Sequence, residues 1–352
     1  MIYNLSKNDI KLLEKLFERN DLNIMSANMY LDFIENYPHV FSSDDENYTR
    51  DFINLMEIDE EDFQNKKFIN DYIFNSISKL DFEKYIHNEY LANVKPQEYK
   101  KGNIELKYQS YKKYETFISD DIYVNEGFVE NSKLGYFDKE FKFLTLLEND
   151  QIWMLISPNE INTMQKHVNE ANGNVLVLGL GLGYFPYMIS LKNNIKSITI
   201  IENNKDIIDM FNLHISQYFN KKIPLNIKYC DAIDELKNAN KYDFIFCDLW
   251  HNPNDALSLY FKIKNFENQK TRFSYWLENG ILALIRRCLI TLIEEETNHS
   301  SDEDYIKSDN ITDTLINKMH FYLKNKKINN YEDIKKLLSD DSLKSLARNI
   351  EL

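Results

Sequence analysis

Three of the eight glycines in this 352-residue chain lie within five positions, as Gly179, Gly181 and Gly183. An average chain of this length has about 25 glycines, so backbone freedom is concentrated at one point. The glycines follow the apolar run 175–178 and precede a segment with helical spacing. A glycine turn between a buried strand and a helix lets the backbone approach a ligand closely, and the helix start supplies free N–H groups.

Acidic residues end the strands that are expected after this turn. Glu202 lies about 20 residues further on, where a carboxylate can accept both hydroxyls of a ribose. Asp231, followed by Ala232, ends the next strand at a place that suits an adenine amino group, and it equally suits a helix N-cap. Asp248 ends the fourth strand. Because the ends of parallel strands meet at one edge of a sheet, these residues predict a nucleoside-binding crevice.

This series resembles the class I S-adenosylmethionine-dependent methyltransferases, and within them the spermidine synthase-like branch. The resemblance covers about residues 145–255. It implies S-adenosylmethionine as the cofactor. The alternating GxGxG spacing also differs from the GxGxxG of nicotinamide-dependent dehydrogenases. The residues expected to bind the cofactor are Gly179, Gly181, Gly183, Glu202, Asp231, Ala232 and Asp248.

Departures from the aminopropyltransferases of that branch favour a different reaction. The family's glycine turn carries an Asp that faces the transferred ammonium, and Leu182 stands there in this chain. An unpaired buried cation costs several kcal/mol. Residues 163–165 replace the family's polyamine contacts, although 147–152 and Asn159–Glu160 resemble its hairpin and acidic pair. We expect methyl transfer to a small molecule, with aminopropyl transfer or a non-catalytic nucleotide-binding or interaction module as alternatives.

Asp248 and His251 are the candidate catalytic residues. The site's main task in methyl transfer is alignment of the acceptor, which can supply about 7 to 11 kcal/mol of the barrier. Either side chain could take a proton from an amine or hydroxyl acceptor, or Asp248 could only contact the cofactor and His251 could be incidental. Trp250 and the cluster 184–187 either shape an aromatic pocket or pack in the core.

The fold class expected around this site is α/β, with a doubly wound Rossmann-like methyltransferase sheet. The chain after residue 296 has helical spacing, so an antiparallel hairpin that would complete a seven-stranded sheet is not found. Four regions are predicted: a helical N-terminal region (1–95), a small β region (96–150), the S-adenosylmethionine-binding α/β domain (151–296) and C-terminal helices (297–352).

Three shorter segments carry their own expectations. Ser6 and Asp9 mark the start of a helix. The segment 281–293 is either a strand followed by a helix or one amphipathic helix, and Arg286–Arg287 within it are expected on a solvated face. Residues 294–310 are polar and charged, which predicts a loop.

Composition excludes several classes of protein. The net charge of -14 argues against a nucleic-acid partner, because counterion release needs clustered Lys and Arg. Three scattered cysteines and seven histidines show no disulfide or metal-ligand spacing, so no metal is expected. The start of the chain has no signal-peptide character, and the apolar run 175–191 is too short and interrupted for a membrane span. We expect a cytoplasmic protein with a small-molecule acceptor and no membrane partner; a homodimer stays open.

Overall fold

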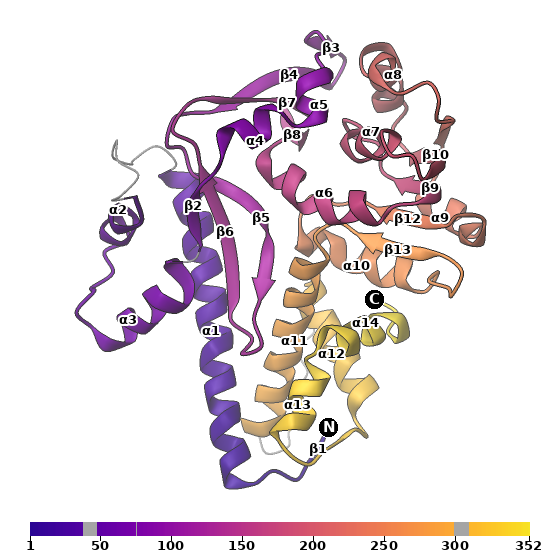
Figure 1. The fold of residues 1–352 in the computed structure, drawn as a ribbon. Coiled ribbons are helices and arrows are strands. Elements are labelled where there is room, and N and C mark those ends of the chain that lie inside the picture. Colours follow the sequence, from indigo (N-terminus) through magenta and orange to yellow (C-terminus); the bar gives the residue numbers. More distant parts are fainter. Residues whose placement is uncertain (38–47, 75, 299–309) are drawn as a thin grey trace.

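The computed structural model describes residues 1–37, 48–74, 76–298 and 310–352. A five-stranded parallel sheet lies at the centre of the region 173–275 (Figure 1). In spatial order its strands are β11 (Leu225–Tyr229), β10 (Ile195–Glu202), β9 (Gly173–Leu178), β12 (Phe244–Cys247) and β13 (Arg272–Tyr275). Residues 175–178 and 244–247 are at most 1% exposed, as expected for strands covered on both faces.

The order of the strands reverses beside β9. The chain passes from β9 outward to β10 and β11, then returns to β12 on the other side of β9 and continues to β13. Right-handed crossovers in opposite directions place their helices on opposite faces of the sheet. The connecting helices are α7 (Tyr184–Ser190) between β9 and β10, α8 (Lys205–His214) between β10 and β11, α9 (Ala232–Leu236) between β11 and β12, and α10 (Pro253–Lys264) between β12 and β13. The predicted doubly wound α/β fold is confirmed, and its switch point lies between β9 and β12.

Two smaller sheets precede this domain. One has the order β3 (Tyr99–Lys101), β4 (Ile104–Tyr111), β7 (Phe141–Glu148), β8 (Gln151–Leu155), and the other β2 (Ile77–Lys79), β6 (Glu130–Tyr136), β5 (Phe117–Val124). β7 and β8 form the expected hairpin, with Asn149 and Asp150 at φ 52° and 60° in its turn. Helix α6 (Pro158–Glu170) then leads into β9.

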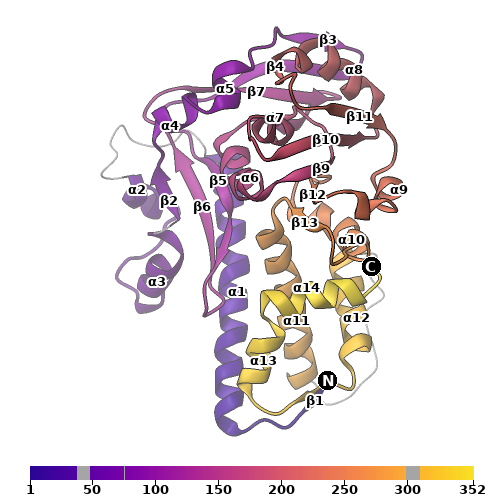
Figure 2. The ribbon, with the colours of Figure 1, turned by 45° about the vertical axis from the view of Figure 1, so that its right-hand side comes forward.

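The long helix near the N-terminus and the helices at the C-terminus lie together below the central sheet (Figure 2). α1 (Lys7–Asn36) begins at the predicted capping box, in which Ser6 and Asp9 accept each other's backbone N–H. It lies beside α11 (Glu278–Asn298), and the C-terminal helices pack on this pair. The remaining helices are α2 (Tyr48–Leu55), α3 (Phe63–Phe68) with a π-helical turn at Ile69–Ile73, α4 (Phe82–Ile86), α5 (Glu89–Asn93), α12 (Ile311–Leu323), α13 (Tyr331–Leu337) and α14 (Asp340–Asn349); β1 (Ile2–Tyr3) pairs with β14 (Lys327–Ile328).

Helix α11 corrects two expectations. It runs unbroken to Asn298, so residues 281–293 form one helix and 294–298 extend it rather than begin a loop; the rest of that predicted loop, 299–309, lies outside the described residues. Arg286 is 3% exposed and donates to the carbonyl of Leu338, while Arg287 donates to Glu130. The predicted solvated face is therefore wrong, because β6 and the C-terminal helices cover it.

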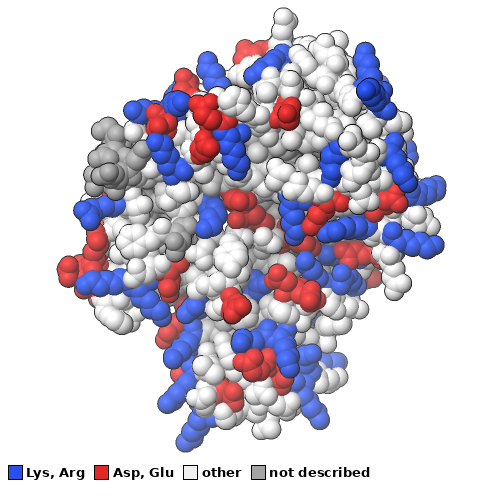
Figure 3. All heavy atoms as spheres, viewed as in Figure 1, with Lys and Arg blue, Asp and Glu red and all other residues white. Residues whose placement is uncertain are grey.

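The described part of the sheet ends at β13, without an antiparallel hairpin beyond it. Among the described helices, none combines the length and the hydropathy needed to cross a bilayer. Acidic and basic side chains are interspersed over the face shown in Figure 3.

Candidate functional site

The glycine turn leaves β9 at the switch point. Gly179, Gly181 and Gly183 have φ of 97°, 48° and 71°, a region that residues with a Cβ rarely adopt. A Cβ on Gly179 would lie 2.0 Å from the backbone oxygen of Asp248, and one on Gly181 would lie 2.1 Å from Sδ of Met154. The turn is thus held closely between the end of β12 and strand β8.

This close approach predicts a large difference between two glycine substitutions. Gly179→Ala is expected to lower the free energy of unfolding by about 3 kcal/mol or more, since it adds a backbone clash to an unfavourable φ. Gly102→Ala is the matched control, because Gly102 has φ 61° but no atom within 4 Å of a built Cβ; its cost should be about 1 kcal/mol. Urea unfolding measures both, and equal losses would contradict the packing of Asp248 on the turn.

Glu202, at the end of β10, faces the glycine turn. It is 9% exposed, and its carboxylate accepts the backbone N–H groups of Leu180 at 3.2 Å and Asn204 at 2.8 Å. Burial raises the pKa of Glu202, while these two donors act in the opposite direction. A carboxylate has about four acceptor positions, so Glu202 retains capacity for a ribose hydroxyl.

The β7–β8 hairpin closes the other side of the turn, which the sequence did not predict. Sδ of Met154 accepts the N–H of Leu182 at 3.1 Å, and Glu148 accepts Nδ2 of Asn204 at 3.1 Å. The N–H groups of Leu180 and Leu182 therefore both have acceptors within the chain. A ligand that contacts Gly181 must displace Met154, whose unbranched thioether is among the most adaptable side chains.

Asp231 is a helix N-cap, one of the two roles that its position in the sequence suggested. Its Oδ1 accepts the N–H of Ile233 at 2.7 Å, as the N-cap of α9, and the side chain is exposed. Ala232 is the first residue of that helix and is partly buried. Neither residue lines the cavity described next, and their contact with an adenine stays a prediction.

Asp248 lines a cavity of about 670 Å³ together with Glu160 of α6. Glu160 is 6% exposed, and its buried Oε2 has no hydrogen-bond partner among the described residues. Burial, and then the charge of Glu202, raise the pKa of Asp248 to about 7. Burial, and then the charge of Asp248, raise the pKa of Glu160 well above its ordinary value. Two carboxyls without a counterion would stabilise a cationic ligand between them.

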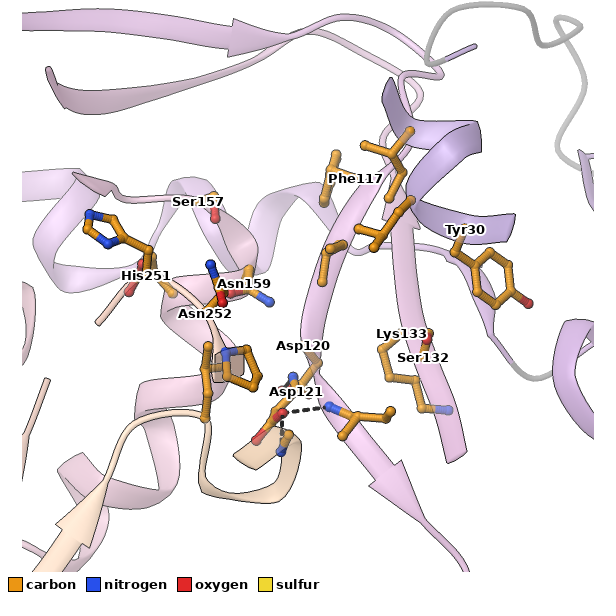
Figure 4. A pocket seen from close by; sticks show the side chains of 18 of the residues that line it. Tyr30, Phe117, Asp120, Asp121, Ser132, Lys133, Ser157, Asn159, His251 and Asn252 are labelled. Atoms are coloured by element: carbon orange, nitrogen blue, oxygen red, sulfur yellow. Dashed lines mark hydrogen bonds between the residues drawn. The ribbon is translucent and has the colours of Figure 1, made fainter. Parts of the chain in front are cut away.

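Tryptophans fix the loop after Asp248. Nε1 of Trp250 donates to the carbonyl of Trp276 at 3.0 Å, and Nε1 of Trp276 donates to Thr163 at 2.9 Å. His251 lies further out: its Nδ1 is 3.2 Å from Asp255, and its ring is 4.4 Å from that of Trp153, edge to face. Figure 4 shows His251 at one side of the cavity, whose lining also includes Trp250 and Trp276.

The structure brings only some of the predicted residues to this cavity. Asp248, Trp250 and His251 line it, whereas the three glycines and Glu202 do not. Leu182 is 0% exposed within the core and does not line the cavity either. Glu160 and Asp248 place two acidic groups there, so Leu182 alone does not separate methyl from aminopropyl transfer. Tyr184, Phe185 and Tyr187 pack in the core.

The chain matches no known protein family and no curated protein. Among solved structures it is similar to spermidine synthase from Thermotoga maritima, with a TM-score of 0.31 and 11% identity over 42% of this chain and 59% of that one. A spermidine synthase in complex with the transition-state analogue AdoDATO gives a TM-score of 0.30 and 11% identity, over 42% of this chain and 58% of that one. The chain thus spans less than two thirds of either synthase, and the reversal of strand order beside β9 carries the fold assignment.

Proposed function

We propose that this chain is an S-adenosylmethionine-dependent transferase that methylates an amine of the small-molecule class. One observation supports the proposal above all. Asp248 packs against Gly179 at the switch point and also lines the cavity that contains the unpartnered Glu160. A carboxyl in that position links the crevice expected to hold the nucleoside with a chamber suited to a cation.

The residues would divide the work as follows. The bound cofactor supplies an activated methyl group. Glu202 accepts ribose hydroxyls, Asp231 lies toward the adenine, and the glycines permit close approach, once Met154 has turned away from Gly181. Asp248, with a pKa of about 7, exists in both protonation states near neutrality, which suits it to accept a proton from an ammonium acceptor. Glu160 holds the acceptor's charge.

Aminopropyl transfer is the second candidate. An aminopropyl donor carries an ammonium group of its own, and the sequence argument against it rested on the apolar Leu182 and on residues 163–165. The carboxyls of Glu160 and Asp248 weaken that argument, because both line the cavity and have no hydrogen-bond partner among the described side chains.

Calorimetry and product analysis test the two candidates. We expect the purified chain to bind S-adenosylmethionine and S-adenosylhomocysteine, and to release S-adenosylhomocysteine when primary amines are added. Release of methylthioadenosine from the decarboxylated cofactor would select aminopropyl transfer instead. If S-adenosylmethionine, S-adenosylhomocysteine and decarboxylated S-adenosylmethionine all fail to bind, both proposals are overturned. Binding without turnover on any amine would favour a non-catalytic module.

A further inference from the structure

The cavity beside Asp248 extends well beyond the two carboxyls. Figure 4 shows Ser157, Asn159 and His251 at one side, and Tyr30 and Lys133 at the other, with β5 between them. A volume of about 670 Å³ lies within the range that accommodates a drug-sized ligand. A methylamine or a short diamine would leave most of it unfilled.

The far part of the cavity is largely apolar. It lies between α1, β5 and α11, and we call it the far lobe. The lining side chains that lie on these three elements include Leu31, Ile34, Ile118, Ile122 and Leu284. Such a surface gains free energy by covering hydrocarbon rather than charge.

Two acidic residues of β5 that line the far lobe, Asp120 and Asp121, accept backbone hydrogen bonds. Asp121 accepts the backbone N–H groups of Ile122, Asn279 and Gly280, at 2.7, 3.1 and 3.1 Å. It thereby fastens β5 to the start of α11. Asp120 accepts the N–H of Asp121 at 2.8 Å.

The two carboxyls beside Trp250 lack such donors in the described part of the chain. Glu115, elsewhere in the lining, accepts the N–H of Lys112 at 2.6 Å. Among the described carboxyls of the lining, those without a hydrogen-bond partner on the chain are Glu160 and Asp248. Glu160 is more than nine-tenths buried and its Oε2 is unpartnered, so one cation-binding position lies at one end of an apolar chamber.

We propose that the acceptor is an amphiphile: a primary ammonium group between Glu160 and Asp248, joined to an aliphatic body that fills the far lobe. A diamine of the same length is a poorer ligand, because its second ammonium would lose hydration among apolar side chains and would share the far side of the cavity with the cation of Lys133. The inference rests on the proposed function for the reaction, but the binding it describes requires no cofactor.

Calorimetry with n-alkylamines tests the inference on the full chain without cofactor. Affinity should rise by up to about fourfold for each methylene buried, from butylamine to decylamine, at concentrations below micelle formation. The matched α,ω-diamines should bind at least tenfold more weakly than the monoamines. Affinity that is independent of chain length, or tighter binding of the diamines, would overturn the inference. Because cofactor binding is measured separately, either result leaves the proposed function to its own test.

Three variants locate the two ends of the ligand. Glu160→Gln should weaken decylamine at least tenfold and leave decanol binding unchanged, since it removes charge and keeps shape. Leu31→Asn, in the far lobe, should lower the ratio of decylamine to butylamine affinity about threefold. Ile24→Asn is its control, because Ile24 is also exposed on α1 but does not line the cavity. An equal effect of the two α1 variants would place the aliphatic body elsewhere.

Discussion

Asp248→Asn should stabilise the folded protein at pH 8 and, at the same time, lower the rate of the proposed methyl transfer by about 10²- to 10⁴-fold. The variant keeps the shape of the side chain and removes its charge. In the folded chain, burial and the charge of Glu202 raise the pKa of Asp248 from 3.8 to about 7. The folded state therefore holds this proton more tightly than the unfolded chain does.

The sign of the effect on stability follows from that difference. Between pH 4 and pH 7 unfolding releases the proton of Asp248, so this residue makes the wild-type protein less stable as the pH rises. Asn does not titrate in this range, so it makes no pH-dependent contribution to the free energy of unfolding. The variant should equal the wild type near pH 4 and exceed it by about 1 to 3 kcal/mol at pH 8.

Urea unfolding at several pH values measures the effect. Asp209→Asn is the control, because that side chain is exposed on α8 and forms no hydrogen bond or ion pair with the described residues; its stability should stay near that of the wild type at every pH. Glu160→Gln should raise the free energy of unfolding at pH 8 as Asp248→Asn does. The double variant should gain less stability than the sum of the two single variants, because each ionised carboxylate raises the free-energy cost of ionising the other. A variant Asp248→Asn that is less stable than the wild type at pH 8 would show that the carboxylate has a stabilising partner.

The sheet could be predicted from the sequence because the residue pattern of each strand identifies it without knowledge of distant contacts. Residues 175–178 are continuously apolar, and the strand ends carry Glu202, Asp231 and Asp248 at intervals that a doubly wound sheet imposes. Sequence reasoning also placed the start of α1, since the capping box needs only local residues. These features depend on neighbours along the chain.

The rest of the site depends on contacts that the local pattern does not encode. Met154 reaches the glycine turn because β8 lies across it, and nothing in the strand pattern indicates that contact. Arg286 is buried because helices from the end of the chain cover α11. Glu160 could have been identified from its position in the sequence. It shares the buried face of α6 with Met164 and His167, and an acidic residue on the buried face of a helix indicates either an ion-pair partner within the protein or a bound ligand.

Met154→Ala should tighten the binding of S-adenosylhomocysteine about tenfold. In the wild-type chain a ligand that contacts the glycine turn must break the contact between Sδ of Met154 and the N–H of Leu182, and must move the thioether from Gly181. A binding-competent arrangement that is populated only one time in ten lowers the apparent affinity tenfold. Alanine keeps the strand and removes the obstruction.

Ile152→Ala is the matched control in the same strand. Ile152 lines the cavity and is 50% exposed, but its replacement leaves Met154 on the turn, so the affinity for S-adenosylhomocysteine should stay at the wild-type value. Calorimetry on both variants compares them directly. Weaker binding by Met154→Ala would assign Met154 a contact with the ligand itself, and the closed turn would then be the shape that the cofactor binds. Tighter binding would instead make β8 a cover that the cofactor must displace before Asp248 and the acceptor can meet it.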